Sequence, residues 1–409
     1  MQNFDIIAIG GGAVGFFAAI NAAILNPTLK IAILEQGNDV LSKVRVSGGG
    51  RCNLTHDCHD PKLLIKYYPR GNKELLGPFY NFGPEDTRQW FDDHGVPTKV
   101  EEDGRVFPTS NTSESIISCF MKLCEQYHIE VKTSQKVVDI SMSKPHVVTT
   151  KKDVFTCQYL VIATGSVLSM WSLLQSKGYD IIEPVPSLFT FQMQNHPICA
   201  LQGLSVKNVS IKIPEAGIQT EGALLMTHWG MSGPAILKAS AWGAVPLAKM
   251  DYRFDMEVDW IPKIQMQEIE QLRNTASKKT VATSSPYDAI PLRLWKFLMD
   301  FVQIPSTKNY ASLTKGEMQA IVSVLKKCPF HVDGKATFKA EFVTAGGVEL
   351  SQINFKTFES KRHENVYFAG EVLNIDAVTG GFNFQAAWTG AYHIAQSIVS
   401  KCGKGVTNF

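Results

Sequence analysis

The sequence has 409 residues, of which 40 are basic and 38 acidic, with a net charge of +2 at neutral pH. That length exceeds one hydrophobic core, so we expect two or three domains, and the near-neutral charge gives no electrostatic argument for binding nucleic acid or an anionic membrane. No apolar run reaches the roughly 18–20 residues of a membrane span, the start lacks a leader pattern, and the eight cysteines are scattered without a Cys-x-x-Cys pair. We therefore expect a cytoplasmic protein with free thiols.

The first residues predict a nucleotide-binding turn. An apolar strand at 6–9 runs into Gly10-x-Gly12-x-x-Gly15 and then into a helix of small residues at 16–25. Gly10 permits a tight turn, Gly12 lets a diphosphate approach the backbone, and Gly15 lets helix and strand pack closely. The helix N-terminus offers free N–H groups to the phosphates.

An acidic residue supplies the context that a lone glycine motif lacks. A second strand, 30–34, ends in Glu35, about twenty residues after Gly15. A carboxylate there accepts hydrogen bonds from ribose hydroxyls, with Gln36 beside it.

A second glycine cluster, Ser47-Gly-Gly-Gly50-Arg51-Cys52-Asn53, cannot be the interior of a stable helix or strand. It predicts backbone lying against a planar or anionic ligand, with Arg51 pairing a phosphate and Asn53 offering a donor and an acceptor. The alternative is a flexible surface loop. Cysteines and histidines crowd this region, but their spacing fits no zinc site, so we predict no metal and interpret Cys52 as a packed thiol beside the cofactor.

The next part of the chain predicts a return to the first sheet. The pattern indicates helices at 85–94 and 112–127 and strands at 104–108, 129–131, 136–140, 146–150 and 154–158. Val137 either gives its amide to an adenine ring or is ordinary core. A further hydrophobic strand from 159 ends in Ala163-Thr164-Gly165, where small residues let a ligand approach the sheet edge.

From about residue 188 the pattern changes to short antiparallel strands. His228 precedes a predicted helix with Ser232 as N-cap and Pro234 in its first turn. His228 is either structural or faces substrate. Helices are predicted at 264–275, 291–302 and 314–326, the last opening on a capping box of Thr314 and Glu317.

The final part predicts a second cofactor platform. A strand over 341–348 is expected to enter a glycine turn, and a strand at 366–371 ends in Gly370-Glu371. A Gly380-Gly381 turn then feeds a helix expected to end near 397, whose N-terminus would face a pyrimidine ring. Because Glu371 can accept a ribityl hydroxyl, and a nicotinamide enzyme needs no such distal platform, we predict FAD rather than NAD.

Five motifs occur together and in order, and through them the sequence resembles the aminoacetone oxidase-like (YhiN-type) FAD-binding proteins, a group that includes a bile-acid Δ4,6-reductase. They are Gly10-x-Gly-x-x-Gly15, Ser47-Gly-Gly-Gly-Arg-Cys-Asn53, Thr227-His-x-Gly-x-Ser-Gly-Pro234, Thr344-Ala-Gly-Gly-Val348 and Gly370-Glu-Val-Leu with Gly380-Gly-Phe-Asn-x-Gln385.

The resemblance implies an α/β fold: a glutathione-reductase-like Rossmann domain with an inserted antiparallel β-barrel and a small helical subdomain. The expected boundaries are 1–187 and 344–409 for the FAD domain, 188–260 for the barrel, 261–330 for the helical subdomain and 331–343 for a return strand. The substrate is expected between the flavin and the barrel.

Carried over by motif, the residues around FAD are Gly10, Gly12, Ala13, Glu35, Gln36, Arg45, Ser47, Gly50, Cys52, Val137, Ala163, Thr164, Gly165, Gly370, Glu371, Phe382, Asn383 and Gln385. Gly15 and Gly381 join them from the reasoning above. The sequence departs from the family pattern at His56, usually Asn, and at Phe382, commonly Tyr. It also departs at Asn374 and Ala377, which replace the common Asp and Gly, so substrate preference does not transfer.

We therefore predict an FAD-dependent oxidoreductase that moves hydride through flavin N5, with a small organic substrate and NAD(P)H as a transient reductant. His228, Arg51 and Asn53 are the candidate catalytic residues. The alternatives are a flavin-dependent RNA-modifying enzyme, which the charge balance disfavours, and a non-catalytic flavin-binding protein.

Overall fold

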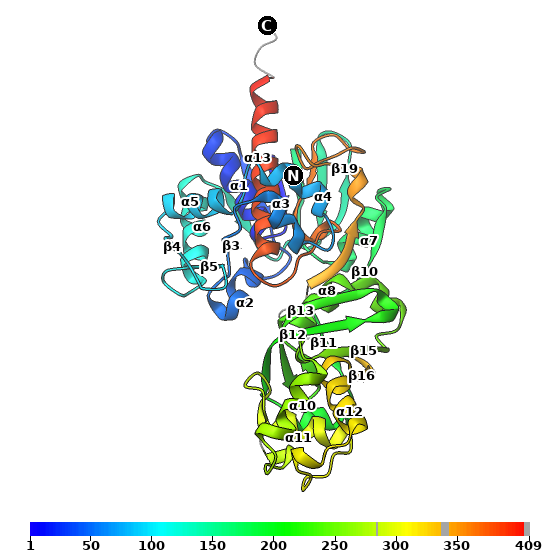
Figure 1. Cartoon of the computed structure of the whole chain (residues 1–409). Coiled ribbons are helices and arrows are strands. Elements are labelled where there is room, and N and C mark those ends of the chain that lie inside the picture. The colour runs from blue at the N-terminus through cyan, green and yellow to red at the C-terminus, as the bar shows by residue number, and fades with distance from the viewer. Residues whose placement is uncertain (284, 337–342, 405–409) are drawn as a thin grey trace. The chain divides into compact units, whose positions relative to one another are not determined.

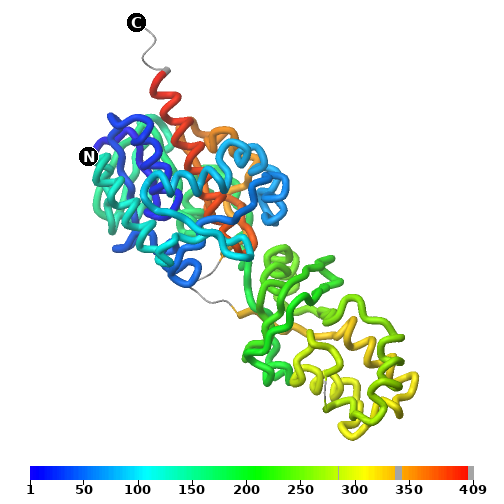
Figure 2. The backbone as a smooth tube through the Cα atoms, turned by 60° about the vertical axis from the view of Figure 1, so that its left-hand side comes forward, coloured from blue at the N-terminus to red at the C-terminus, as the bar shows by residue number. Residues whose placement is uncertain are grey.

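The computed structural model describes residues 1–283, 285–336 and 343–404, and the chain forms two compact units. Unit 1 comprises residues 1–184 and 343–409, so both ends of the chain belong to it (Figure 2). Unit 2 comprises residues 185–342. No helix within the described ranges is long and apolar enough to cross a membrane.

Unit 1 is built on a nine-stranded sheet with a parallel centre (Figure 1). The order β19-β20-β21-β9-β1-β2-β6 places β1 between β9 and β2, and β7 and β8 extend the sheet from β9. A three-stranded sheet, β3-β5-β4, lies outside it, and β10 and β18 pair separately. The strands are β1 (Gln2–Ile9), β2 (Ile31–Leu34), β3 (Thr55–His56), β4 (Thr98–Val100), β5 (Arg105–Pro108), β6 (Glu130–Lys132), β7 (Val137–Ser141), β8 (His146–Thr150), β9 (Val154–Ile162), β10 (Ile181–Ser187), β18 (Val343–Val348), β19 (Ile353–Asn354), β20 (Glu359–Ser360) and β21 (Val366–Phe368).

Two helices from opposite ends of the sequence pack together in this unit. The contact between α1 and α13 includes Phe17 and Trp388, whose ring centroids lie 5.2 Å apart. Small residues such as Ala18 and Ala391 are buried in these helices, which allows close approach. The helices of unit 1 are α1 (Ala13–Leu25), α2 (Ser42–Gly50), α3 (Pro61–Leu64), α4 (Asn72–Phe79), α5 (Pro84–Asp93), α6 (Glu114–Gln126), α7 (Leu168–Ser176) and α13 (Phe382–Lys404).

Unit 2 contains a seven-stranded antiparallel sheet in the order β16-β15-β12-β13-β14-β11-β17. The two edge strands follow one another in the chain, separated only by Asp333, so the sheet must curve strongly. Its strands are β11 (Thr190–Gln192), β12 (Ser205–Ile213), β13 (Ile218–Thr227), β14 (Gly230–Ser232), β15 (Phe254–Asp259), β16 (Cys328–Val332) and β17 (Gly334–Ala336).

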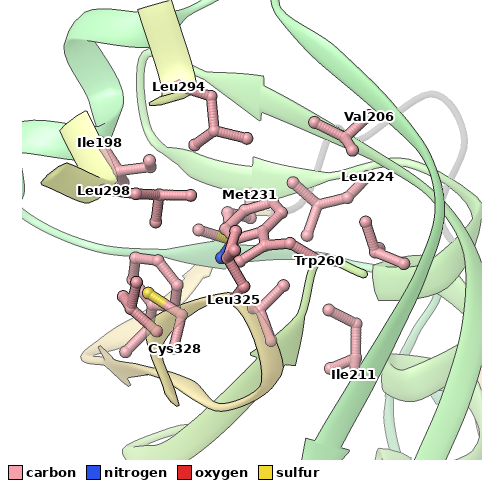
Figure 3. Packing of buried hydrophobic residues seen from close by; sticks show 14 of the residues in the cluster. Ile198, Val206, Ile211, Leu224, Met231, Trp260, Leu294, Leu298, Leu325 and Cys328 are labelled. Atoms are coloured by element: carbon pink, nitrogen blue, oxygen red, sulfur yellow. The ribbon is translucent and has the colours of Figure 1, made fainter. Parts of the chain in front are cut away.

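Helices and sheet share one hydrophobic core in unit 2. Trp260 lies among Met231, Leu325 and Cys328, and Leu298 belongs to the same cluster (Figure 3). The helices are α8 (Pro234–Trp242), α9 (Ala244–Lys249), α10 (Met266–Thr275), α11 (Leu292–Phe301) and α12 (Lys315–Lys326).

Four local predictions need correction. The strands expected at 154–158 and from 159 are one strand, β9, because no glycine or proline interrupts them. The glycine turn expected at Gly346-Gly347, within 341–348, is a strand instead. Both glycines lie inside β18 at φ +114° and +122°, where a Cβ would meet backbone atoms at 2.7 and 2.6 Å. Residues 341 and 342 of the predicted segment lie outside the described ranges.

The other two corrections concern helix ends. Helix α13 continues to Lys404 rather than ending near 397. The N-cap of α8 is Gly233, at φ +93°, whereas Ser232 ends β14 and accepts a hydrogen bond from Thr190 at 2.9 Å.

Candidate functional site: a dinucleotide cradle in unit 1

The three motif glycines after β1 have two different structural roles. Gly10 is at φ +116°, and a Cβ there would lie 2.3 Å from the Ala163 carbonyl oxygen. A Cβ at Gly15 would lie 2.0 Å from the oxygen of Gly10. A Cβ at Gly12 would meet no atom within 4 Å. Gly10 and Gly15 are therefore required by the fold, whereas Gly12 borders open space that a ligand can enter.

Glu35 is fixed beside this turn by two backbone amides. Its carboxylate accepts hydrogen bonds from Gly11 N and Gly37 N, both at 2.8 Å, while Gln36 between them is exposed. Helix α1 begins at Ala13 without a side-chain cap and without an acidic residue in its first turn. Its N-terminal amides thus remain available to an anion.

Three segments far apart in sequence meet at the ends of β1, β9 and β21. Ala163 N donates to Ile9 O at 2.8 Å, and a Cβ at Gly370 would lie 2.8 Å from Val14. Gly165, at φ +61°, would place a Cβ 3.9 Å from Glu371 Oε2.

One hydroxyl at this edge has no partner among the residues that the structure describes. The Thr164 Oγ1 atom is buried and makes no hydrogen bond to any described residue. A buried hydroxyl without a hydrogen-bond partner costs about 1–3 kcal/mol. The unpartnered hydroxyl here therefore points to a bound ligand that would supply the missing hydrogen bond.

Lys43 is a site residue that sequence reasoning missed. Its Nζ forms an ion pair with Glu371, which is 328 residues away in the chain. The only local signal was a cation in the turn of helix preceding Ser47, which does not distinguish it from any surface lysine.

The glycine-rich segment forms a left-handed bend at the end of α2. Ser47 has ψ 150°, and Gly48, Gly49 and Gly50 have φ of +56°, +68° and +83°. A Cβ at Gly48 would meet Asn53 and the Phe107 ring at 2.9 Å, whereas one at Gly49 or Gly50 would meet nothing within 4 Å. The prediction that these glycines form no regular helix interior is confirmed.

The basic residues of this segment are paired with carboxylates. Arg45 pairs with Glu114, and Arg51 pairs with Glu101 at 2.6 Å while its guanidinium lies 3.9 Å from the centre of the Phe107 ring. Arg45 and Arg51 can contact phosphate or substrate, as predicted, in one of two ways. Either the ion pairs rearrange when the ligand binds, or the pairs hold the arginine side chains in place for it.

Asn53 and Cys52 are buried. With its amide nitrogen toward Val106 O and Thr55 O, Asn53 donates to both, at 3.2 and 3.0 Å, and accepts from Gly381 N at 3.0 Å. Asn53 therefore joins the glycine-rich segment to the predicted cofactor platform at 370–385, which we call the C-terminal platform. Burial raises the pKa of the Cys52 thiol to about 12, so this thiol stays protonated at neutral pH.

The C-terminal platform is held by close backbone contact and by internal hydrogen bonds. A Cβ at Gly381, φ +89°, would lie 2.5 Å from Thr55 O. Asn383 accepts from Ala377 N at 2.9 Å and donates to Ala377 O at 3.2 Å. Gln385 is fully buried, where its oxygen accepts from Thr55 at 2.6 Å.

Aromatic rings gather where α13 begins. Phe382 lies 4.2 Å from the Tyr67 ring and 4.7 Å from the His56 ring, both nearly parallel to it. His56 Nε2 lies 3.1 Å from Asp103 O, and burial lowers the His56 pKa. Two of these rings, those of His56 and Phe382, belong to positions where the sequence departs from the family pattern.

A buried ion pair fixes a loop of the C-terminal platform. Arg70 binds the fully buried Asp376 through two nitrogens. The partners are 306 residues apart, so no local pattern could have predicted the pair.

Two predicted residues remain to be placed. Val137 begins β7, opposite Thr150, and it lies two residues after Gln135, whose backbone amide donates to Glu35 O at 2.8 Å. His228 follows β13 in unit 2 and is exposed, with its ring 4.3 Å from that of Trp229. The candidate catalytic residues are thus divided between the units, with Arg51 and Asn53 in unit 1.

The cradle fits FAD on its own geometry. The open face of Gly12, the uncapped N-terminus of α1 and the unpartnered Thr164 hydroxyl suit a diphosphate, and Glu35 and Glu371 suit the two sugar-like parts. Among the described residues, no three His, Cys, Asp or Glu side chains are placed to hold a metal ion.

A family model described as "HI0933-like protein Rossmann domain" matches residues 4–397. The chain belongs to the HI0933-like family. This confirms the resemblance drawn from the motifs and the prediction of an FAD-binding Rossmann fold of the oxidoreductase type.

Curated relatives cover nearly the whole chain. It is 26% identical over 98% of its length to the "Ribosomal RNA dihydrouridine synthase" of Escherichia coli (strain K12), covering 99% of that protein. It is 25% identical over 94% of its length to the "3-dehydro-bile acid delta(4,6)-reductase" of Clostridium scindens, covering 96% of that protein.

A solved structure shares the fold. The 3-ketosteroid-Δ4-(5α)-dehydrogenase of Rhodococcus jostii RHA1 aligns with a TM-score of 0.52 at 12% identity, covering 97% of each chain. At that identity the likeness concerns architecture alone.

Proposed function

We propose that this protein is an FAD-dependent reductase that saturates a carbon–carbon double bond conjugated to a carbonyl group. The observation that carries the proposal is the convergence of an open glycine turn, an unpartnered hydroxyl and the Glu371 carboxylate at one sheet edge. Family membership supports FAD as the ligand of that cradle.

The names of the relatives favour this reaction class. A 3-dehydro-bile acid with double bonds at positions 4 and 6 is a conjugated ketone, and uracil carries its 5,6 double bond next to the C4 carbonyl. Reduction of either substrate adds hydride to a carbon conjugated with the carbonyl group and a proton to the neighbouring carbon of the same double bond. One bond type thus accounts for relatives whose substrates are unrelated in size.

In this proposal the chain's own residues hold and orient the reactants. The amides at the start of α1 bind the diphosphate, Glu35 the ribose, and Glu371 the ribityl chain. Flavin supplies the hydride when bound. His228 is the candidate proton donor, and Arg51 and Asn53 are the candidate positioning groups, with NAD(P)H as transient reductant and a small organic molecule as substrate.

The expected architecture of the insertion stays part of the proposal. We describe unit 2 as a β-barrel with a helical subdomain, supported by its curved antiparallel sheet and by α10, α11 and α12.

The reaction is tested by anaerobic turnover of a steroid-like conjugated ketone with NADPH or NADH, with mass spectrometry of the product. We expect a product that has gained two hydrogen atoms. A flavin-loaded enzyme that oxidises NAD(P)H but reduces the double bond of neither a conjugated ketone nor uridine in RNA contradicts the proposal.

The proton donor is tested separately. His228→Ala should lower turnover while FAD stays bound, and His331→Ala, an exposed histidine of the same unit that pairs with Asp255, is the matched control. Unchanged turnover in His228→Ala removes it from the mechanism.

A second candidate is reduction of a uracil base within RNA, favoured by an uneven distribution of charge. Residues 185–342 contain 17 basic and 13 acidic residues, which leaves 23 basic and 25 acidic of the chain's 40 and 38 for unit 1. The near-neutral total therefore conceals a basic unit 2. Turnover on a uridine-containing RNA but not on free conjugated ketones would select this candidate.

A further inference from the structure

Two segments of unit 2, residues 271–283 and 303–317, form what we call the basic cap. They carry five cationic side chains and one carboxylate, that of Glu317. The cations are Arg273, Lys278, Lys279, Lys308 and Lys315.

Backbone hydrogen bonds hold the two segments side by side. Val281 N donates to Lys308 O at 2.8 Å, and Tyr310 N donates to Lys279 O at 3.1 Å. Residues 280 and 309 form an isolated antiparallel bridge between them. The side chains of Val281 and Tyr310 are buried beneath this crossing. The cationic residues therefore project from adjoining, fixed backbone rather than from a flexible tail.

Most of the positive charge in the cap is uncompensated. Lys308 pairs with Glu317 at 3.0 Å. The side chains of Arg273, Lys278, Lys279 and Lys315 are exposed, and no ion pair joins them to any acidic residue in the part of the chain that the structure describes. Ordinary protein surface intersperses both signs of charge, so four cations without an ion pair, carried on two segments held side by side, favour an anionic partner.

Hydroxyl and amide side chains accompany the cations. Besides Tyr310, the two segments contain twelve such residues, which are Gln271, Asn274, Thr275, Ser277, Thr280, Thr283, Gln303, Ser306, Thr307, Asn309, Ser312 and Thr314. Lysine, arginine, serine, threonine and asparagine are the side chains that contact phosphate oxygens in nucleic-acid complexes. Exposed aromatic rings, which would stack bases, are not among the residues of the cap, since Tyr310 is buried.

We propose that the basic cap is a binding surface for the phosphodiester backbone of RNA. It rests on the second candidate substrate above. It assigns the electrostatic part of RNA binding to the C-terminal end of α10, the first residues of α12 and the segments next to them, in the unit where Figure 1 labels these helices. The composition of the cap gives attachment that does not depend on sequence, and any base selection belongs to another part of the protein.

The test is fluorescence anisotropy of a labelled single-stranded RNA of mixed sequence, titrated with FAD-loaded full-length protein at several salt concentrations. The variant is R273Q/K278Q/K279Q/K315Q, which removes the unpaired charges and leaves the Lys308–Glu317 pair. The matched control, K62Q/K66Q/K151Q/K152Q, removes four exposed lysines of unit 1.

We expect the cap variant to bind RNA at least about tenfold more weakly than wild type, and its salt slope to fall by up to about 3, because each neutralised phosphate contributes roughly 0.7–0.9 to that slope. The control should bind within about twofold of wild type. The flavin spectrum and thermal transition of the cap variant show whether it is folded.

Three outcomes would overturn the proposal. They are equal losses in both variants, an unchanged salt slope in the cap variant, and wild-type protein that binds vesicles rich in phosphatidylserine but not RNA. Because binding is measured without turnover, a protein that fails this test but still reduces a free conjugated ketone leaves the proposed reaction intact. A protein that binds RNA through the cap but reduces nothing contradicts the reaction and not the surface.

Discussion

Substituting alanine for Gly12 and for Gly15 should distinguish a glycine that leaves room for the cofactor from a glycine that the fold requires. Gly12 has φ −100°, which alanine adopts without strain, and an added Cβ meets no atom within 4 Å. Because alanine is a poorer N-cap than glycine, we expect Gly12→Ala to lower the stability of the FAD-free protein by no more than about 1 kcal/mol.

The same methyl group projects into the space assigned to the diphosphate. Forcing a methyl group into an occupied site costs about 1–3 kcal/mol, so FAD should bind Gly12→Ala roughly 5- to 150-fold more weakly. In contrast, a Cβ at Gly15 would lie 2.0 Å from the Gly10 carbonyl oxygen, and backbone cannot move aside cheaply. Gly15→Ala should therefore destabilise the protein itself, by more than about 3 kcal/mol.

The assay combines thermal unfolding of FAD-free protein with titration of FAD, followed by quenching of flavin fluorescence. If Gly12→Ala binds FAD like wild type, the open space beside Gly12 is not where the cofactor lies. If Gly15→Ala is as stable as wild type, the close approach of α1 to β1 is not the reason for glycine there.

Three further predictions concern buried groups. Arg70→Leu removes the cation that pairs with the buried Asp376 and should cost about 3–5 kcal/mol in chemical denaturation. Arg105→Leu, which breaks the solvent-accessible pairs of Arg105 with Asp103 and Glu101, should cost about 0–1 kcal/mol. Equal losses would contradict the importance of burial. With its pKa raised to about 12, Cys52 should resist iodoacetamide at pH 8 in native protein and react only after unfolding, as peptide mapping would reveal. Burial, with Lys144 nearby, lowers the His146 pKa from 6.5, so the unfolded chain binds a proton at this histidine more readily than the folded chain does. Stability should therefore fall as pH drops below about 6.5, and His146→Leu should flatten this part of the pH profile in thermal melts.

The sequence predicted those parts of the cradle that are encoded locally. The turn at Gly10 to Gly15 follows from an apolar strand, three spaced glycines and a helix, and Glu35 follows at the spacing that the fold requires. The capping box is equally local: Thr314 accepts from Glu317 N at 3.2 Å, and α12 begins at the next residue. Such features depend on neighbours within a few residues, which sequence patterns describe well.

What the sequence did not predict depends on contacts between distant residues. Lys43 and Glu371 are far apart in the chain, as are Arg70 and Asp376, and each becomes a pair only when β1, β9 and β21 assemble. Gly346 and Gly347 predicted a turn, but glycine occurs both in turns and in strands that another backbone segment approaches closely. Only the structure shows that backbone atoms lie beside these two glycines.

The net charge of the whole chain likewise conceals a difference between its two units. The total of +2 averages a basic unit 2 with an acidic unit 1, and only the division of the chain into units separates them. Whether a set of lysines forms a surface depends on which backbone segments meet, as the two segments of the basic cap do at residues 280 and 309.

The central claim, that FAD in this cradle reduces a conjugated double bond, is tested most directly by the flavin's own visible absorbance. Purified protein is reduced anaerobically with NADPH or NADH until the oxidised flavin band disappears, and a steroid-like conjugated ketone or a uridine-containing RNA is then added without oxygen. We predict that one of the two substrates restores the oxidised band and is itself reduced. A flavin that stays reduced until air is admitted, whichever substrate is added, would contradict the account.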